Sequence, residues 1–246
     1  MDASPPFRVD GTAALSRRRL LQLAGTAGLA AATVYSTKST ALAAPAMPSA
    51  SRAVLCRDAW GADAPRPGGT PHQPSRLTIH HTAVVLGDNS NAPARLRQHQ
   101  HYHQDTQGWI DIAYHLSVDR DGNIYELRTP QLVGDTATNY DPTGHFLVVC
   151  EGNFDEEQVT EQQVDGAALA FAWAAQQFDI PTETLAGHRD VSSETSCPGA
   201  SLYSHVASGD LRSRVDGLLA GGPVDLYPLC GPEAAATVAD IESGRR

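Results

Sequence analysis

Two histidines and a cysteine make up the group in this chain that is best suited to bind a metal ion. His188 and Cys197 lie nine residues apart, and the adjacent His80 and His81 offer a second source of imidazole. Catalytic zinc takes three protein ligands and keeps a fourth position for water, and His and Cys are among its preferred ligands. One histidine of the 80–81 pair, together with His188 and Cys197, supplies that number.

The alternation of residues 77–82 predicts a β-strand. Adjacent strand residues point to opposite faces, so only one of His80 and His81 can reach the metal, and the pattern does not decide which. Two neutral imidazoles and a thiolate leave a bound zinc ion with net positive charge, so it can polarise a carbonyl and activate water. That chemistry suits hydrolysis of an amide.

The chain holds ten histidines, so some groupings arise by chance. His99, His101 and His103 alternate along a predicted helix. We expect them to form a solvated helix face or an unrelated metal-binding tract, and we leave them out of the candidate site.

The first 43 residues have the features of an export signal. Residues 16–22 contain a twin-arginine pattern, residues 20–34 are weakly apolar, and residues 41–43 offer a small-x-small cleavage site. The apolar run is too short and too rich in Ala, Gly and Thr to be a stable membrane anchor. We therefore expect a secreted protein that is soluble and carries no anchor after cleavage.

The charge balance argues against nucleic acid as a partner. Residues 1–43 hold five of the 18 basic and two of the 28 acidic residues, so the remaining chain has a formal charge of −13. Binding to phosphate backbones or anionic lipid needs clustered cations, which this composition disfavours.

Four cysteines are too few for a disulfide scaffold. Cys56 and Cys230 lie near the two ends of the expected domain and could be joined in an oxidising compartment. Cys150 falls in an apolar run and is expected to be an inert thiol in a buried strand. Cys197 remains, and it lies in the same stretch of chain as His188.

The order of elements predicts a single α/β domain with a central mixed β-sheet flanked by helices and a zinc site in a groove at one face. We expect a flexible lead-in over residues 44–58, the domain over 59–220 and a C-terminal tail over 221–246. The expected strands cover residues 77–82, 113–119, 123–127, 145–151 and 184–186, and the expected helices cover 94–104, 160–180 and 211–219.

Seven motifs between Trp60 and Gly199, in the same order along the chain, carry a resemblance. Together they resemble the type 2 N-acetylmuramoyl-L-alanine amidases, a superfamily that includes phage amidase lysozymes and peptidoglycan recognition proteins. The motifs are residues 60–62, 79–83, 108–115, 121–122, 151–154, 187–191 and 197–199.

The resemblance assigns roles that spacing leaves open. It implies that Zn²⁺ is held by His80, His188 and Cys197, and that the phenol of Tyr114 donates a hydrogen bond to the oxyanion. Thr195 falls where the family places a lysine or threonine beside the reacting water and carbonyl. The implied substrate is peptidoglycan or a muropeptide, cut between N-acetylmuramic acid and L-alanine, and we expect a monomer.

Other residues of these motifs are expected to support the site. Trp109 and Asp111 should brace the sheet, and Arg189 and Asp190 should form an ion pair that shapes the ligand loop. The interval from His188 to Cys197 is one residue longer than the usual family form. Thr136 replaces a histidine of the phage members, so a secondary acid or substrate contact is absent, and His115 replaces an asparagine common in the recognition proteins.

Two alternatives remain open from the sequence. The chain could be a non-catalytic module that recognises peptidoglycan, although such members typically lack the cysteine ligand. It could also be a cysteine hydrolase that uses Cys197 with His188, which would require a thiolate nucleophile.

Overall fold

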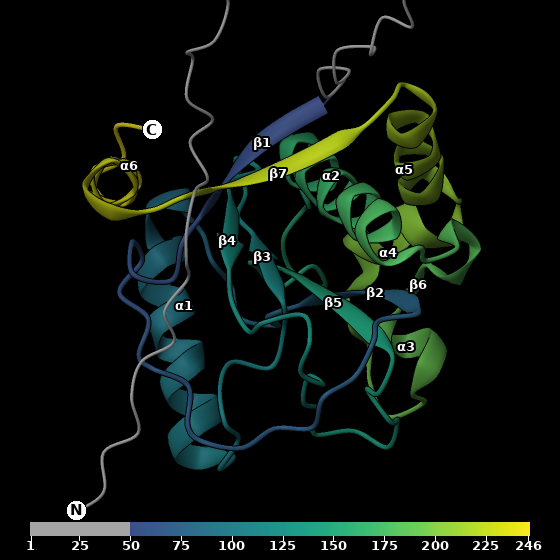
Figure 1. Cartoon of the computed structure of the whole chain (residues 1–246), viewed down its shortest axis with the longest axis horizontal. Coiled ribbons are helices and arrows are strands. Elements are labelled where there is room, and N and C mark those ends of the chain that lie inside the picture. Colours follow the sequence, from purple (N-terminus) through teal and green to yellow (C-terminus); the bar gives the residue numbers. More distant parts are fainter. Residues whose placement is uncertain (1–49) are drawn as a thin grey trace, which may run out of the picture. The chain divides into compact units, whose positions relative to one another are not determined.

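A seven-stranded mixed sheet forms the centre of the protein in a computed structural model that describes residues 50–246 (Figure 1). Its strand order is β6-β2-β5-β3-β4-β1-β7, and every neighbouring pair is parallel except β3 and β4. The predicted single domain with a mixed sheet flanked by helices is confirmed. The strands are β1 (Ala50–Leu55), β2 (Arg76–His81), β3 (Leu116–Val118), β4 (Ile124–Glu126), β5 (His145–Cys150), β6 (Ala186–Gly187) and β7 (Val224–Leu229).

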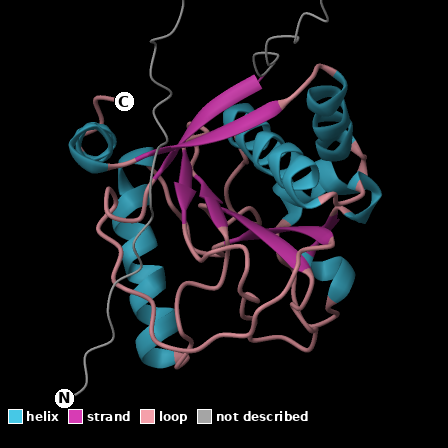
Figure 2. Cartoon of the chain, viewed as in Figure 1, coloured by secondary structure: helices cyan, strands magenta, loops and turns pink. Residues whose placement is uncertain are grey.

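Helices cover both faces of the sheet (Figure 2). One face packs on α2 through an apolar core that includes Ile79, Phe146 and Phe171, and the other packs on α1 and α6 through residues such as Leu96 and Val238. The helices are α1 (Ala92–His101), α2 (Glu161–Phe178), α3 (His188–Val191), α4 (Ala200–Ala207), α5 (Asp210–Ala220) and α6 (Gly231–Glu242), with a π-helical turn, Tyr102–Thr106, directly after α1.

Local sequence explains the limits of α2. The Thr160 hydroxyl accepts a hydrogen bond from the backbone N–H of Gln163 at 3.1 Å and so caps the start of the helix. The Gln163 side chain donates to Val118 O and Glu151 O instead of returning to the cap, so it ties the helix start to two strands. The helix ends at Asp179, which adopts a left-handed conformation.

Both ends of the described chain differ from the expectation. Ala50–Leu55 was expected to lie in a flexible lead-in and Val224–Leu229 in a tail, yet they pair as β1 and β7 along their full length, from Ala50 opposite Val224 to Leu55 opposite Leu229. The tail also contains α6, which packs on α1. A parallel pairing between the two ends of the chain leaves little local trace in sequence, which explains the error.

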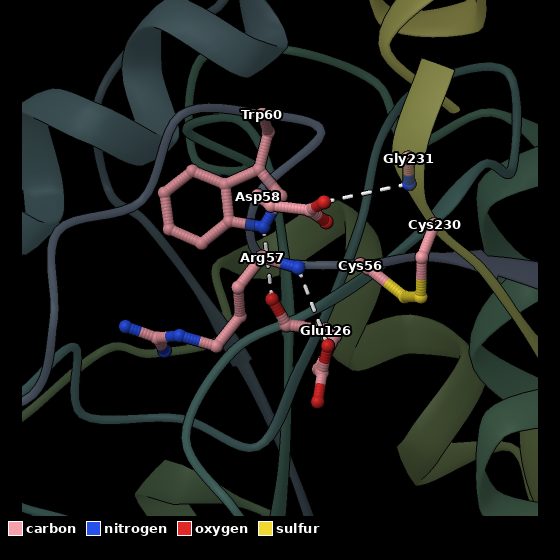
Figure 3. Close-up of a disulfide and its surroundings, with 7 residues drawn as sticks. All are labelled: Cys56, Arg57, Asp58, Trp60, Glu126, Cys230 and Gly231. Carbon is pink, nitrogen blue, oxygen red and sulfur yellow. Dashed lines mark hydrogen bonds between the residues drawn. A yellow bond between two sulfur atoms is a disulfide. The ribbon is translucent and has the colours of Figure 1, made fainter. Parts of the chain in front are cut away.

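A disulfide fixes this edge of the sheet. Cys56, directly after β1, is bonded to Cys230, directly before α6, as Figure 3 shows. Trp60 Nε1 donates to Glu126 O at 2.9 Å, and so holds the chain after the disulfide against β4. The predicted pairing is therefore present, and Cys150 is a buried free thiol in β5 as expected.

The proposed export signal lies outside the described residues, so it stays a prediction. Among residues 50–246, no helix is long and apolar enough to cross a membrane. The elements that position the candidate site all belong to this described part.

The disulfide should be a large contributor to stability because it closes a loop across a sequence separation of 174 residues. Replacing both Cys56 and Cys230 with serine should lower the free energy of unfolding by about 2–5 kcal/mol. Urea denaturation followed by circular dichroism would measure the loss. The double variant should be insensitive to reductant, whereas the unmodified protein should lose a similar amount on reduction; equal stability with and without reductant in the unmodified protein would contradict the prediction.

Candidate metal centre

The three sequence-predicted ligands come together at one end of the sheet. His80 lies near the end of β2, His188 begins α3 directly after β6, and Cys197 lies on the following loop. Because Ile79 pairs with Gly187, the parallel pairing of β2 and β6 brings the two histidines side by side. The ligand atoms of all three residues lie within 4.8 Å of one another, and all three side chains are buried.

His81 points away from this group. Its imidazole stacks on Phe154, with ring centroids 6.0 Å apart, and its Nδ1 accepts a hydrogen bond from the Phe154 N–H at 3.3 Å. Its own backbone N–H donates to Cys197 Sγ at 3.4 Å. Strand alternation therefore works as expected, and His80 is the histidine that faces His188 and Cys197.

The loop around Cys197 is held by short polar contacts. Thr195 Oγ1 accepts a hydrogen bond from the Cys197 N–H at 3.1 Å, and the backbone N–H of Arg189 donates to Cys197 O at 2.8 Å. The Arg189 guanidinium donates to Ser196 O. Thr195 also lines the adjacent groove, so its hydroxyl both supports the loop and faces the site.

The expected ion pair between Arg189 and Asp190 is wrong: no such pair occurs among the described residues. The Arg189 guanidinium lies over the ring of Tyr203, 4.3 Å from its centroid. Asp190 instead accepts hydrogen bonds from the Gly187 N–H and the Tyr203 hydroxyl. Adjacent helical side chains point in different directions, so each residue stabilises the loop through other partners rather than through the other member of the pair.

Thr138 contacts the second candidate histidine ligand, His188. Its Oγ1 lies 2.8 Å from His188 Nε2 and 2.8 Å from Thr136 Oγ1, and the ring of Tyr140 packs on the imidazole with centroids 4.9 Å apart. This contact occupies Nε2 and leaves His188 Nδ1 for a metal. Thr138 was missed from sequence, where the one signal was its place in the polar stretch that contains Thr136.

Charge and distance both fit a metal ion. Burial lowers the pKa of His188 to about 4 and that of His80 well below its ordinary value, so both imidazoles are neutral, as ligands must be. Burial raises the pKa of the Cys197 thiol to about 12, so it needs a bound cation to ionise near neutral pH. His80 Nδ1 lies 3.7 Å from Cys197 Sγ, close to the separation of about 3.5 Å for two ligands of one tetrahedral zinc ion.

A groove of about 270 Å³ opens above the three ligands. Tyr114 forms part of its lining, with its ring 5.1 Å from the His80 ring. Burial raises the pKa of Tyr114, so the phenol keeps its proton and can donate a hydrogen bond. The other lining residues include Tyr102, His103, Gln107 and Trp109 after α1, and Asp135, Thr136, Ala137 and Thr138 before β5.

The three helical histidines differ in exposure, so they do not form the expected solvated face, and they are not grouped as a metal site among residues 50–246. His101 is exposed, as expected. His103 is buried and lines the groove, and its Nδ1 accepts a hydrogen bond from the Ala113 N–H at 3.2 Å, which places the proton of the neutral ring on Nε2. His99 faces inward toward Glu151. The switch from α1 to a π-turn reorients this segment.

Trp109 and Asp111 have different roles, although both were expected to brace the sheet. Asp111 is buried and pairs with Arg57 at 2.8 Å, and Gln100 Nε2 donates to it at 2.8 Å, so it braces the fold as expected. Trp109 instead lines the groove and packs on His103, with ring centroids 4.8 Å apart. The turn between these two residues points the indole outward.

The fold matches that of known peptidoglycan recognition proteins and of an amidase. The structure is similar to that of Drosophila peptidoglycan recognition protein LB, with a TM-score of 0.56 and 29% identity, covering 64% of this chain and 94% of that one. It is also similar to N-acetylmuramoyl-L-alanine amidase LysC from Clostridium intestinale, with a TM-score of 0.50 and 25% identity, covering 65% and 97%. A tyrosine-to-phenylalanine mutant of the Drosophila LB protein has been solved in complex with tracheal cytotoxin.

Residues 70–200 match the N-acetylmuramoyl-L-alanine amidase family model, and the chain belongs to this family. Drosophila melanogaster peptidoglycan recognition protein SC2 is 32% identical over 134 residues, which are 54% of this chain and 72% of that protein. Human N-acetylmuramoyl-L-alanine amidase is 35% identical over 132 residues, which are 52% of this chain and 23% of the human protein. The resemblance seen in the motifs is thereby confirmed.

The contact between Thr138 and His188 gives a test of the metal centre that does not depend on catalysis. Replacing Thr138 with valine removes the hydrogen bond to Nε2 and should weaken zinc binding about tenfold or more, because the imidazole is no longer held in one orientation. Competition with a chromophoric chelator would measure the affinity. Thr237→Val, on α6 outside the groove lining, is the control; equal zinc affinity in the two variants would rule out this role.

Proposed function

We propose that the protein is an exported zinc amidase that hydrolyses the bond between the lactyl group of N-acetylmuramic acid and L-alanine in peptidoglycan. The observation that carries the proposal is the convergence of His80, His188 and Cys197 within 4.8 Å at the floor of a groove. Tyr114 lies beside this group with a protonated phenol. Membership of the amidase family supports the reaction class.

His80, His188 and Cys197 would hold the zinc ion through neutral nitrogens and a thiolate. Zinc supplies a Lewis acid that polarises the amide carbonyl and lowers the pKa of water toward neutrality. The Tyr114 phenol donates a hydrogen bond to the oxygen that gains negative charge as the carbonyl is attacked. Thr195 Oγ1 accepts from the Cys197 N–H, so its own proton remains free to be donated to an oxygen in the groove.

Export is the part of the proposal that rests on the first 43 residues and on the disulfide. The Cys56–Cys230 bond requires an oxidising compartment to persist, which fits a secreted protein. The acidic character of the chain fits a soluble protein that binds its substrate through specific contacts in the groove rather than by general attraction to an anionic polymer.

A second candidate function is binding of peptidoglycan without cleavage. Recognition proteins share the fold, and the complex of a related protein with tracheal cytotoxin supports a groove that holds a muropeptide. The presence of Cys197 beside His80 and His188 favours the amidase. A cysteine hydrolase is disfavoured, because burial raises the pKa of Cys197 to about 12 while a nucleophilic cysteine needs a lowered pKa.

Release of new L-alanine amino termini from purified peptidoglycan would test the proposal directly. The protein is assayed as purified, after chelation, and after zinc readdition. Activity that is lost on chelation and restored by zinc supports the amidase. Tight binding of peptidoglycan with no release of amino termini, by protein with zinc bound, would favour the recognition module, and activity that survives chelation but not thiol alkylation would favour the cysteine hydrolase.

Cys197→Ser should abolish both zinc binding and hydrolysis, because the hydroxyl of serine does not ionise to replace the thiolate ligand. Zinc content by mass spectrometry and the amino-terminus assay would measure the two effects. Ser196→Ala, at the neighbouring exposed position, is the control. Hydrolysis retained by the serine variant would refute the assignment of Cys197 as a ligand.

Tyr114→Phe should lower kcat by about 10²–10³ with zinc affinity unchanged, because the change removes only a hydroxyl that donates to the developing oxyanion. Steady-state kinetics on a soluble muropeptide, with zinc content measured in parallel, would show the split. Tyr102→Phe alters a phenol that is half exposed at the groove and hydrogen-bonded to Gln107, and should leave kcat within about twofold. Similar kcat values for the two variants would remove Tyr114 from the catalytic step.

A further inference from the structure

A buried carboxyl group that the proposed reaction does not use lies beneath the wall of the groove. Glu151, directly after β5, is fully buried. Its Oε1 accepts a hydrogen bond from Ser117 Oγ at 2.7 Å, whereas its Oε2 has no hydrogen-bond partner among the described residues. A buried carboxyl oxygen without a partner is costly, so a specific neighbour is expected to compensate it.

His99 is that neighbour. Its Nδ1 lies 3.9 Å from Glu151 Oε2, less than about 1 Å beyond the range of a hydrogen bond. The His99 side chain is 13% exposed and projects inward from α1, so the two groups meet where α1 packs on the end of β5. Within residues 50–246, the carboxyl of Glu151 is the group that His99 Nδ1 approaches as an ion-pair partner.

Ring contacts connect this pair to the groove. His99 stacks on His103 with centroids 6.3 Å apart, His103 packs on Tyr114 at 6.0 Å, and Tyr114 packs on the metal ligand His80 at 5.1 Å. His103 belongs to the π-turn that follows α1 and lines the groove. A continuous series of ring contacts therefore leads from His99 on α1 to the groove.

The environment of the pair favours the neutral forms. Burial raises the pKa of Glu151 to about 8, and the nearby Asp119 raises it further while the Ser117 hydrogen bond and Arg95 lower it. Burial lowers the pKa of His99 to about 3, and His103 and Arg95 act in the same direction. The titratable or charged groups that face Glu151 are Arg95 and His99 from α1, Tyr114, Asp119 and Tyr125 from the β3–β4 region, and its neighbour Cys150.

We propose that Glu151 is a positioning residue for the groove: its protonated carboxyl donates a hydrogen bond to His99 Nδ1 and so holds α1 and His103 in place. The proton sits on Oε2, because Oε1 accepts from Ser117. The inference rests on the proposed function only in treating the groove as a muropeptide site; the contact itself does not depend on hydrolysis.

The proposal predicts a loss of groove order at high pH. Because the pKa of Glu151 in the folded protein is raised, the stabilisation it gives is fully present below its ordinary value and is lost as pH rises through about 8. The ionised carboxylate has no proton to donate to His99 Nδ1, so the hydrogen bond that positions α1 is lost. Binding of a muropeptide should therefore weaken above pH 8 while the metal ligands stay assembled.

Glu151→Gln separates this role from a general effect of pH. Glutamine is uncharged at every pH and keeps an N–H donor toward His99, so it imitates the protonated acid. In the full-length zinc-bound protein, affinity for the stem pentapeptide, which lacks the bond that the proposed reaction cleaves, is measured by calorimetry. It should fall about tenfold between about pH 7 and about pH 9.5 for the unmodified protein, an effect of about one hydrogen bond. The affinity of Glu151→Gln should change less than about twofold over the same range.

Two further variants and one direct readout complete the test. His99→Leu should bind weakly at both pH values, and Glu233→Gln, an exposed carboxyl on α6, should behave as the unmodified protein. In the unmodified protein, the ¹⁵N shift of His99 Nδ1 should be that of a hydrogen-bond acceptor at the lower pH and that of a free ring nitrogen at the higher pH. In Glu151→Gln the shift should be that of an acceptor at both pH values. Identical pH profiles for the unmodified protein and Glu151→Gln, in both affinity and ¹⁵N shift, would overturn the proposal.

Hydrolysis and the ¹⁵N shift of His99 test the proposed function and the positioning role separately. Failure to hydrolyse peptidoglycan, with the expected ¹⁵N behaviour of His99, would reject the amidase and leave the positioning role. Hydrolysis with no pH-dependent change in the ¹⁵N shift of His99 would support the amidase and reject the positioning role. If His99→Leu does not fold, the comparison of Glu151→Gln with the unmodified protein still decides.

Discussion

The parallel pairing of β2 with β6 is the constraint on which the geometry of the candidate metal centre depends. His80 and His188 are far apart in sequence, and they meet because Ile79 lies opposite Gly187. A side chain at position 187 would come within 3.0 Å of Pro198, the residue next to Cys197, so the glycine lets the third ligand's loop lie against β6. One short strand pair thus sets the position of two ligands and leaves space for the loop that carries the third.

The two faces of the sheet differ in the polarity of the side chains that pack on them. The face toward α2 is almost wholly apolar, with small residues such as Ala168 and Ala172 that allow the helix to pack closely. The side of the sheet toward α1 holds buried polar groups, including Gln100, Asp111 and Glu151. Polar groups in a core cost stability unless they are paired, and Asp111 is paired with both Gln100 and Arg57.

Sequence predicts the local parts of this structure well and the long-range parts poorly. Strand alternation predicts that only one histidine of the 80–81 pair can face the candidate metal site, and the range 160–180 predicted for a helix agrees closely with α2. The pairing of β1 with β7, the contact of Thr138 with His188 Nε2, and the inward turn of His99 and His103 arise from packing between distant segments. No periodic pattern encodes which ring nitrogen is occupied or which end of the chain closes the sheet, so these features emerge only in three dimensions.

The disulfide also decides how the protein responds to mechanical tension. A force that pulls on Ala50 and on α6 passes along β1 to Cys56, crosses the disulfide to Cys230 and leaves through α6. Residues 57–229, which contain His80, His188 and Cys197, lie outside that path. A pull on these two points would therefore be borne by β1, the disulfide and α6, and it would bypass the segment that carries the candidate metal ligands.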